Sequence, residues 1–160
     1  MPELFLGSQI CEMAIETERK GATFYNAVAS AAKTREVRDF CLRMAAAERE
    51  HEATFKAMLS SLAHYAPAES YPGEYVDYVH ALLERDVMPG EEAGKRLAAE
   101  VKSERDAVDF AIQFEKTTIL FLQEMRNFVP QQQRPAVDKL IEEERSHVIG
   151  LVQLRNTLRP

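Results

Sequence analysis

Four long segments of this 160-residue chain place apolar side chains at alternating intervals of three and four residues. That spacing puts the side chains on one side of an α-helix and is typical of helices that pack in an antiparallel bundle. Glycine and proline, which often end helices, fall mainly between these segments. The sequence therefore predicts an all-α fold in one domain spanning residues 1–160. Its long helices are expected at roughly 3–31, 35–64, 103–129 and 134–158.

The connection between the second and third predicted helices, residues 65–102, is too long for a tight turn. Helical spacing of apolar residues predicts one short helix around 74–87, and a second is expected around 92–101. Such a connection can carry the chain along the length of the bundle. At its end, Ser103 followed by Asp106 is similar to a capping box and marks the start of the third long helix.

Each long helix carries a glutamate near the middle of its apolar stripe, where an apolar residue belongs. These glutamates are Glu18, Glu48, Glu115 and Glu144. In the second and fourth helices a histidine, His51 or His147, follows the glutamate three residues later. Residues three apart lie on the same side of a helix, so each Glu-x-x-His motif directs a carboxylate and an imidazole into the bundle.

Four carboxylates inside a bundle would repel one another and lose their hydration, which is costly unless they gain a partner. The apolar stripes contain no lysine or arginine that could neutralise them. Two divalent cations would balance the four negative charges and leave the imidazoles as neutral nitrogen ligands. This mixed oxygen and nitrogen set suits two iron ions, with manganese or zinc as substitutes.

The chain also contains an internal repeat. Residues 14–18 align with residues 111–115, an offset of 97, and the two Glu-x-x-His motifs are offset by 96. The first two helices therefore look like a duplicated copy of the last two. Pseudo-twofold symmetry would bring the two halves of the site together, each half supplying one glutamate and one Glu-x-x-His motif.

The run over residues 14–25, AIETERKGATFY, resembles the first helix of rubrerythrin-like proteins in the ferritin-like di-iron carboxylate superfamily. The resemblance covers all four long helices. It implies a ferritin-like four-helix bundle in which Glu18 and Glu115 are terminal ligands and Glu48 and Glu144 bridge the metals. His51 and His147 would each complete one metal, and a homodimer is expected.

Two features depart from typical rubrerythrins. Those proteins carry a C-terminal rubredoxin domain that supplies electrons, whereas this sequence ends after the fourth helix and lacks the cysteines for one. They also carry a further glutamate three residues after the third-helix ligand, where this chain has Thr118. Electrons for catalysis are therefore expected from an external donor.

Composition limits the remaining possibilities. The net charge of −6 argues against nucleic acid and anionic membranes as partners. No apolar run reaches transmembrane length, and the first residues do not have the pattern of a secretory signal. A cytoplasmic protein is expected.

Several further residues have more than one interpretation. Tyr25 is either a hydroxyl donor to a bridging carboxylate or a core aromatic residue whose hydroxyl bonds elsewhere. His80 with Glu84 could form another ligand pair, but a surface or packing role for His80 is favoured, and His64 is expected to be exposed. Cys11 and Cys41 are predicted to be small buried residues that do not pair. The remaining glutamates near the motifs are predicted to lie on solvated helix faces: Glu16, Glu50, Glu52, Glu142 and Glu143.

The favoured function is oxidation of two Fe(II) ions by O₂ or hydrogen peroxide in a dry pocket lined by Met44, Phe55 and Leu122. An alternative is iron binding, storage or delivery without repeated turnover. A zinc-holding structural or regulatory bundle and a manganese-dependent peroxide dismutase are further alternatives.

Overall fold

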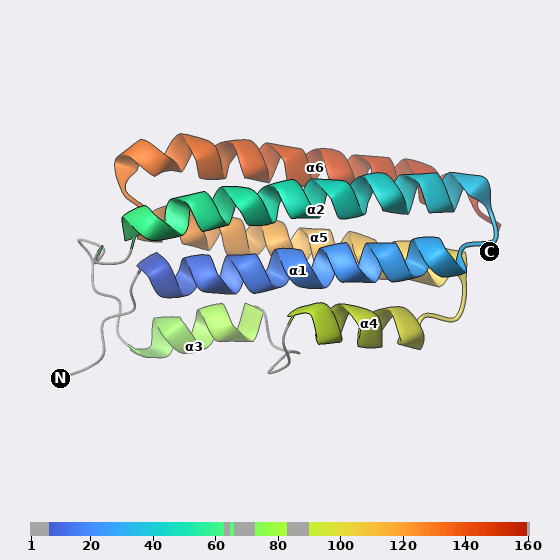
Figure 1. Ribbon diagram of the computed structural model, residues 1–160, viewed down its shortest axis with the longest axis horizontal. Helices are drawn as coiled ribbons and strands as arrows, with labels where there is room; N and C mark the ends of the chain where they lie inside the picture. The colour runs from blue at the N-terminus through green and yellow to red at the C-terminus, as the bar shows by residue number, and fades with distance from the viewer. Residues whose placement is uncertain (1–6, 63–64, 66–72, 83–89, 160) are drawn as a thin grey trace.

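The computed structural model describes residues 7–62, 65, 73–82 and 90–159, and these regions contain helices and no strands. Four long helices form a bundle, and Figure 1 shows them running side by side along its length. They are α1 (Gly7–Ala31), α2 (Arg35–Leu62), α5 (Glu104–Met125) and α6 (Arg134–Thr157). The prediction of an all-α bundle is confirmed. None of the described helices combines the length and apolarity needed to cross a membrane.

Two short helices, α3 (Gly73–Leu82) and α4 (Gly90–Glu100), connect the two halves of the bundle. They follow one another along the length of the bundle and carry the chain from one end to the other (Figure 1), with α4 packed against α1 and α3 against α5. Both predicted short helices are therefore present. The second begins at Gly90 rather than at residue 92, and residues 83–87 of the first lie outside the described part.

Local hydrogen bonds explain where α5 begins. The Ser103 hydroxyl accepts a hydrogen bond from the backbone N–H of Asp106 at 3.0 Å, as expected of an N-cap. The Asp106 carboxylate accepts from the backbone N–H of Lys102 at 2.8 Å, one residue before the donor in a standard capping box. The helix ends at Met125 rather than at residue 129, because the next three residues tighten into a 3₁₀ turn.

The predicted apolar stripes face the interior of the bundle. Their residues are buried, except for His147 and Leu158, which are partly buried. Buried apolar residues form two clusters along the bundle, with Phe55 and Leu122 in one and Met44 and Leu151 in the other. The stripe glutamates lie between these clusters in all four helix sequences.

The two cysteines lie in different clusters, Cys11 in the first and Cys41 in the second. Both are free and buried, which confirms the prediction that they do not pair. The Cys11 thiol donates to the backbone carbonyl of Phe55 at 3.1 Å and so links α1 to α2.

Helix α4 packs very close to α1 through two glycines four residues apart. A Cβ atom on Gly90 would lie 2.2 Å from the backbone oxygen of Glu16, and one on Gly94 would lie 2.4 Å from that of Lys20. The Glu16 carboxylate also accepts a hydrogen bond from the backbone N–H of Gly90 at 2.8 Å. A side chain at either glycine would therefore push the crossover away from the bundle.

We expect Gly94→Ala to lower the free energy of unfolding by about 1–3 kcal/mol, because the new methyl group would overlap backbone atoms of α1. Gly150→Ala on α6 is a matched control, since its methyl group would meet the ring of Phe40 at 3.1 Å and alanine favours the helix. Chemical denaturation followed by circular dichroism measures both variants. Equal losses in the two variants would contradict the close packing of α4.

Burial raises the pKa of both thiols to about 12, with a smaller contribution from Glu12 at Cys11 and from Glu104 at Cys41. The thiols are therefore protonated at mildly alkaline pH and shielded from reagents. We expect an aromatic disulfide reagent to react roughly 100-fold more slowly with the native protein than with the unfolded chain. Rapid modification of either cysteine in the native protein would show that its cluster opens readily.

Candidate metal centre

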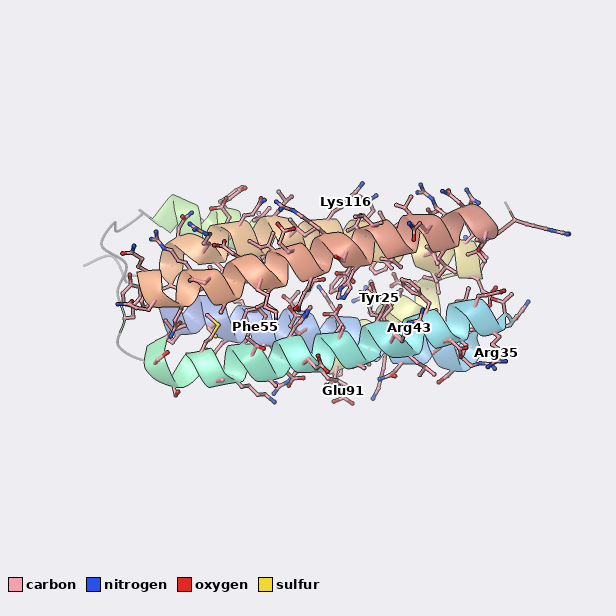
Figure 2. The ribbon with its side chains drawn as sticks, turned by 90° about the horizontal axis from the view of Figure 1, so that it is seen from above. Tyr25, Arg35, Arg43, Phe55, Glu91 and Lys116 are labelled. Carbon is pink, nitrogen blue, oxygen red and sulfur yellow. The ribbon has the colours of Figure 1, made fainter. Side chains whose placement is uncertain are left out.

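Four glutamates, one from each long helix, meet between the two apolar clusters. Their side chains are almost fully buried, at no more than 1% exposure for any of Glu18, Glu48, Glu115 and Glu144. By contrast, the charged side chains of Arg35, Glu91 and Lys116 are exposed and point outward (Figure 2). The four glutamates therefore form an enclosed layer of carboxylates.

Two overlapping groups within this layer have the composition of metal sites. Each contains three carboxylates and one imidazole, with candidate ligand atoms within 4.8 Å of one another. One group is Glu18, Glu48, Glu144 and His51, and the other is Glu48, Glu115, Glu144 and His147. Glu48 and Glu144 belong to both groups. The structure thus brings together all six residues singled out in the sequence and shares the two that were expected to bridge.

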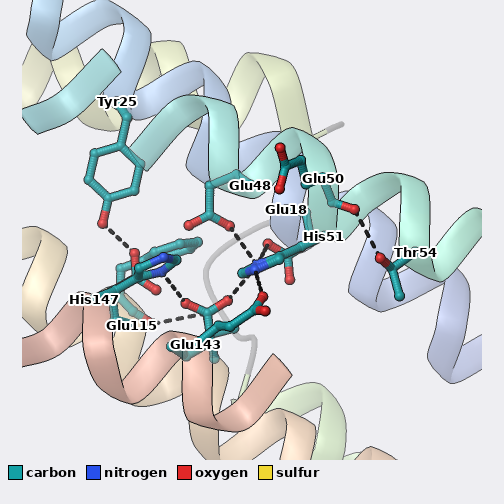
Figure 3. A network of polar contacts seen from close by, with 12 residues as sticks. Glu18, Tyr25, Glu48, Glu50, His51, Thr54, Glu115, Glu143 and His147 are labelled. Atoms are coloured by element: carbon teal, nitrogen blue, oxygen red, sulfur yellow. Dashed lines mark hydrogen bonds and ion pairs between the residues drawn. The ribbon is translucent and has the colours of Figure 1, made fainter. Parts of the chain in front are cut away.

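The imidazole of His51 lies between carboxylates on both sides (Figure 3). Its Nδ1 atom is 2.8 Å from Oε1 of Glu144 and 3.7 Å from Oε2 of Glu18. Its Nε2 atom is 2.9 Å from Oε2 of Glu143. Because an ionised carboxylate can only accept, Nε2 carries the hydrogen in this contact, and in the neutral ring Nδ1 is free to bind a metal.

The imidazole of His147 approaches the same layer from α6. Its Nδ1 atom is 2.7 Å from Oε2 of Glu144, so the two oxygens of Glu144 each face a different histidine. The rings of His51 and His147 stack with their centroids 5.6 Å apart. A carboxylate in this position would lie between two metal ions if one were held beside each histidine.

The negative charge of the four carboxylates is only partly balanced by the two histidines of the cluster. Burial, reinforced by neighbouring carboxylates, raises the pKa of Glu48 and of Glu115 well above its usual value. Burial opposes the charged form of His51, but contacts with Glu144 and Glu18 outweigh it and raise the pKa of this imidazole to about 11. Burial likewise opposes ionisation of Glu144, yet the two histidines hold its pKa at about 2.

Several buried ligand atoms have no hydrogen-bond partner among the described residues. They are both carboxylate oxygens of Glu18 and of Glu48, one oxygen each of Glu115 and Glu144, and Nδ1 of His51. Nδ1 of His51 and Oε1 of Glu144 nevertheless lie 2.8 Å apart as an ion pair, which leaves five carboxylate oxygens without a hydrogen bond in the described part of the chain. Buried polar atoms are normally satisfied, so five such oxygens in one small volume fit a site that holds cations.

Tyr25 is fully buried, and its hydroxyl donates a hydrogen bond to Oε1 of Glu115 (Figure 3). The tyrosine therefore bonds a carboxylate of the cluster, although not one of the two that were expected to bridge. Burial raises the pKa of the Tyr25 hydroxyl well above its usual value, with a further contribution from Glu115. The hydroxyl keeps its proton and orients one oxygen of Glu115.

The prediction of a solvated face was wrong for Glu52. Its side chain is buried against α1, and its carboxylate contacts Arg19 at 2.7 Å, Arg49 at 3.0 Å and Lys56 at 2.7 Å. Burial favours the protonated carboxyl, but hydrogen bonds from these three cations hold its pKa at about 2. Arg49 and Lys56, three residues before and four residues after Glu52, were the sequence signal for this pairing.

Glu143 is partly solvated, as predicted, but its carboxylate also contacts His51 on the neighbouring helix α2, which the prediction missed. It retains contact with water, at 40% side-chain exposure, and with Lys139 at 3.4 Å. Glu16 is likewise only partly solvated, since it caps α4. By contrast, Glu50 and Glu142 are exposed, as predicted.

Of the remaining candidates, only Thr118 has a described side chain, and it adds no ligand to the cluster. Thr118 is buried, but its hydroxyl donates to the backbone carbonyl of Phe114 at 3.1 Å, and it belongs to neither ligand group. The side chain of His80, together with Glu84 and His64, lies outside the described residues.

A helical bundle with two glutamates shared between two carboxylate and histidine groups defines a ferritin-like protein of the di-iron carboxylate class. The chain belongs to the rubrerythrin family, whose sequence model matches residues 9–151. Among solved structures it is similar to a Thermotoga maritima protein described as a ferritin-like diiron-carboxylate protein. The two chains share 23% identity with a TM-score of 0.66 over 98% of each, which supports the fold alone. The search of curated protein sequences gave no match.

We expect Glu48→Gln to raise the stability of the metal-free protein by about 1–2 kcal/mol, because burial and neighbouring carboxylates raise the pKa of Glu48, and glutamine avoids the cost of neutralising a carboxylate that is ionised in the unfolded chain. The same change should abolish most stabilisation by added divalent metal, as measured by thermal unfolding with and without metal. Glu50→Gln, on an exposed position of α2, is the control and should change neither quantity. A less stable metal-free Glu48→Gln protein would mean that the glutamate is paired without metal.

Proposed function

We propose that this protein binds two iron ions through Glu18, Glu48, His51, Glu115, Glu144 and His147. The main support for this proposal is that Glu48 and Glu144 each belong to both groups of candidate ligand atoms. Each group offers one nitrogen and oxygens from three carboxylates, a set that suits iron or manganese. The four buried negative charges match the positive charge of two divalent ions.

We further propose that the bound iron is oxidised by O₂ or hydrogen peroxide. Two adjacent iron ions supply the redox chemistry, because each can give up one electron to the oxidant. The residues of the chain hold the ions, orient the ligand oxygens and exclude water. Met44, Phe55 and Leu122 are buried beside the layer and provide apolar walls on both sides of it. Repeated turnover requires an external electron donor.

Iron binding, storage or delivery without repeated turnover is the second candidate. Thr118 favours it, because this position provides a hydroxyl bonded to its own helix instead of the additional carboxylate of typical rubrerythrins. A site with that carboxylate missing has fewer ways to rearrange its ligands when the charge on iron changes.

Anaerobic titration of the metal-free protein with Fe(II), followed by O₂ or hydrogen peroxide, tests the proposal. We expect two iron ions per chain and a near-ultraviolet ferric absorption after the oxidant is added. Continued peroxide consumption with a small reductant would identify an enzyme. A single stoichiometric oxidation with the ferric ions retained would identify a binding or storage protein.

A variant carrying both Glu48→Ala and Glu144→Ala should lose both iron ions, because each ion would lose two carboxylates. A variant carrying both Glu50→Ala and Glu142→Ala is the matched control, since it removes two exposed glutamates from the same two helices. Full iron binding by the first double variant would overturn the proposal. Selective retention of zinc or manganese over iron would support one of the redox-silent or dismutase alternatives.

A further inference from the structure

The two halves of the site are not equivalent outside the ligands themselves. Glu143 precedes the second Glu-x-x-His motif and bonds the outer nitrogen of His51 at 2.9 Å. The internal repeat, with its offset of 96, pairs Glu143 with Ala47 and His51 with His147. Ala47 has a methyl group where a carboxylate would be needed to hold His147 in the same way. Among the described residues, His147 forms an ion pair only with Glu144, through Nδ1.

The carboxylate–histidine contact has a defined effect on a metal site. An acceptor on the outer nitrogen fixes the tautomer and the ring orientation, and it increases the basicity of the nitrogen that binds metal. His51 receives this support and its side chain is only 4% exposed, whereas the side chain of His147 is 16% exposed. Water therefore reaches His147 more easily than His51.

The two terminal glutamates differ in a way that does not depend on the histidines. Among the described residues, neither carboxylate oxygen of Glu18 has a hydrogen-bond partner, and Oε2 lies 3.7 Å from Nδ1 of His51, a candidate ligand of the same group. In Glu115, Oε1 accepts a hydrogen bond from the Tyr25 hydroxyl, and only Oε2 has no hydrogen-bond partner in the described part of the chain. Glu18 thus offers two oxygens to the His51 group, while Glu115 offers the His147 group one oxygen free of competition.

We propose that the two metal positions bind with unequal affinity, and that Glu143 is the positioning residue that makes the His51 position the tighter one. That position fills first and releases its ion last, while the His147 position is the exchangeable one. The inference rests on the proposed function, because it needs two metal positions, but it concerns their order of filling and not the reaction.

Calorimetric titration of the metal-free protein with Fe(II) under anaerobic conditions tests this inference. We expect two resolved steps for the wild-type protein. Glu143→Ala should weaken the tighter step by roughly 10- to 100-fold and leave the weaker step almost unchanged. Glu143→Gln should recover much of the loss, because its amide oxygen can still accept from Nε2 of His51.

Ala47→Glu tests the inference in the opposite direction, by strengthening the weaker metal position instead of weakening the tighter one. If the new carboxylate reaches the outer nitrogen of His147, the weaker step should tighten and the two affinities should converge. This variant also keeps the inference testable if Glu143→Ala folds poorly, which circular dichroism would reveal. Glu142→Ala is the control, since Glu142 is the exposed neighbour of Glu143 and pairs with Arg145, and it should shift neither step.

Release of iron to a chelator gives a second readout. Wild-type protein should lose its two ions in a fast and a slow phase, and Glu143→Ala should accelerate the slow phase only. The inference is overturned if Glu143→Ala shifts both steps equally, shifts neither, or weakens only the looser step. Failure of the wild-type protein to bind two ions would instead overturn the proposed function, so the two failures are distinguishable.

Discussion

The burial of four carboxylates in the middle of the bundle is the constraint on which the rest of the structure depends. Buried carboxylates are costly because they lose hydration and repel one another, and here several of their oxygens lack any hydrogen-bond partner among the described residues. The apolar clusters on the two sides of the layer must offset that cost. Their residues come from all four long helices, so the core that surrounds the site also fixes the helices relative to one another.

The same layer explains why the metal-free cluster has its particular charge distribution. Contacts with carboxylates raise the pKa of His51 to about 11, while the two histidines hold the pKa of Glu144 at about 2. Glu48 and Glu115, with less compensation, have pKa values raised by burial and by their neighbours. Protons therefore supply part of the positive charge that metal ions would supply when bound, which is why metal binding and protonation must compete at this site.

The six candidate ligands follow the internal repeat of the chain, but the residues around them do not. The repeated helical hairpin supplies two similar ligand sets and the two shared glutamates. Residues around the ligands break the symmetry, because Glu143 supports His51 while Ala47 stands at the equivalent place for His147. Tyr25 also bonds Glu115 on one side only, since residue 122, its equivalent at the offset of 97, is a leucine. Similar ligands in different surroundings do not bind equally.

The sequence by itself determined the helices, their buried faces and the six residues of the cluster. Helical periodicity defines which side chains share a face, and a glutamate in an apolar stripe stands out against that pattern. Only the tertiary structure decided which side chains meet across helices. Glu52 pairs with Arg19 on α1, Glu143 reaches His51 on α2, and α4 rests on α1 through Gly94. Periodicity gives a direction relative to one helix axis, whereas such contacts depend on the spacing and rotation of two packed helices.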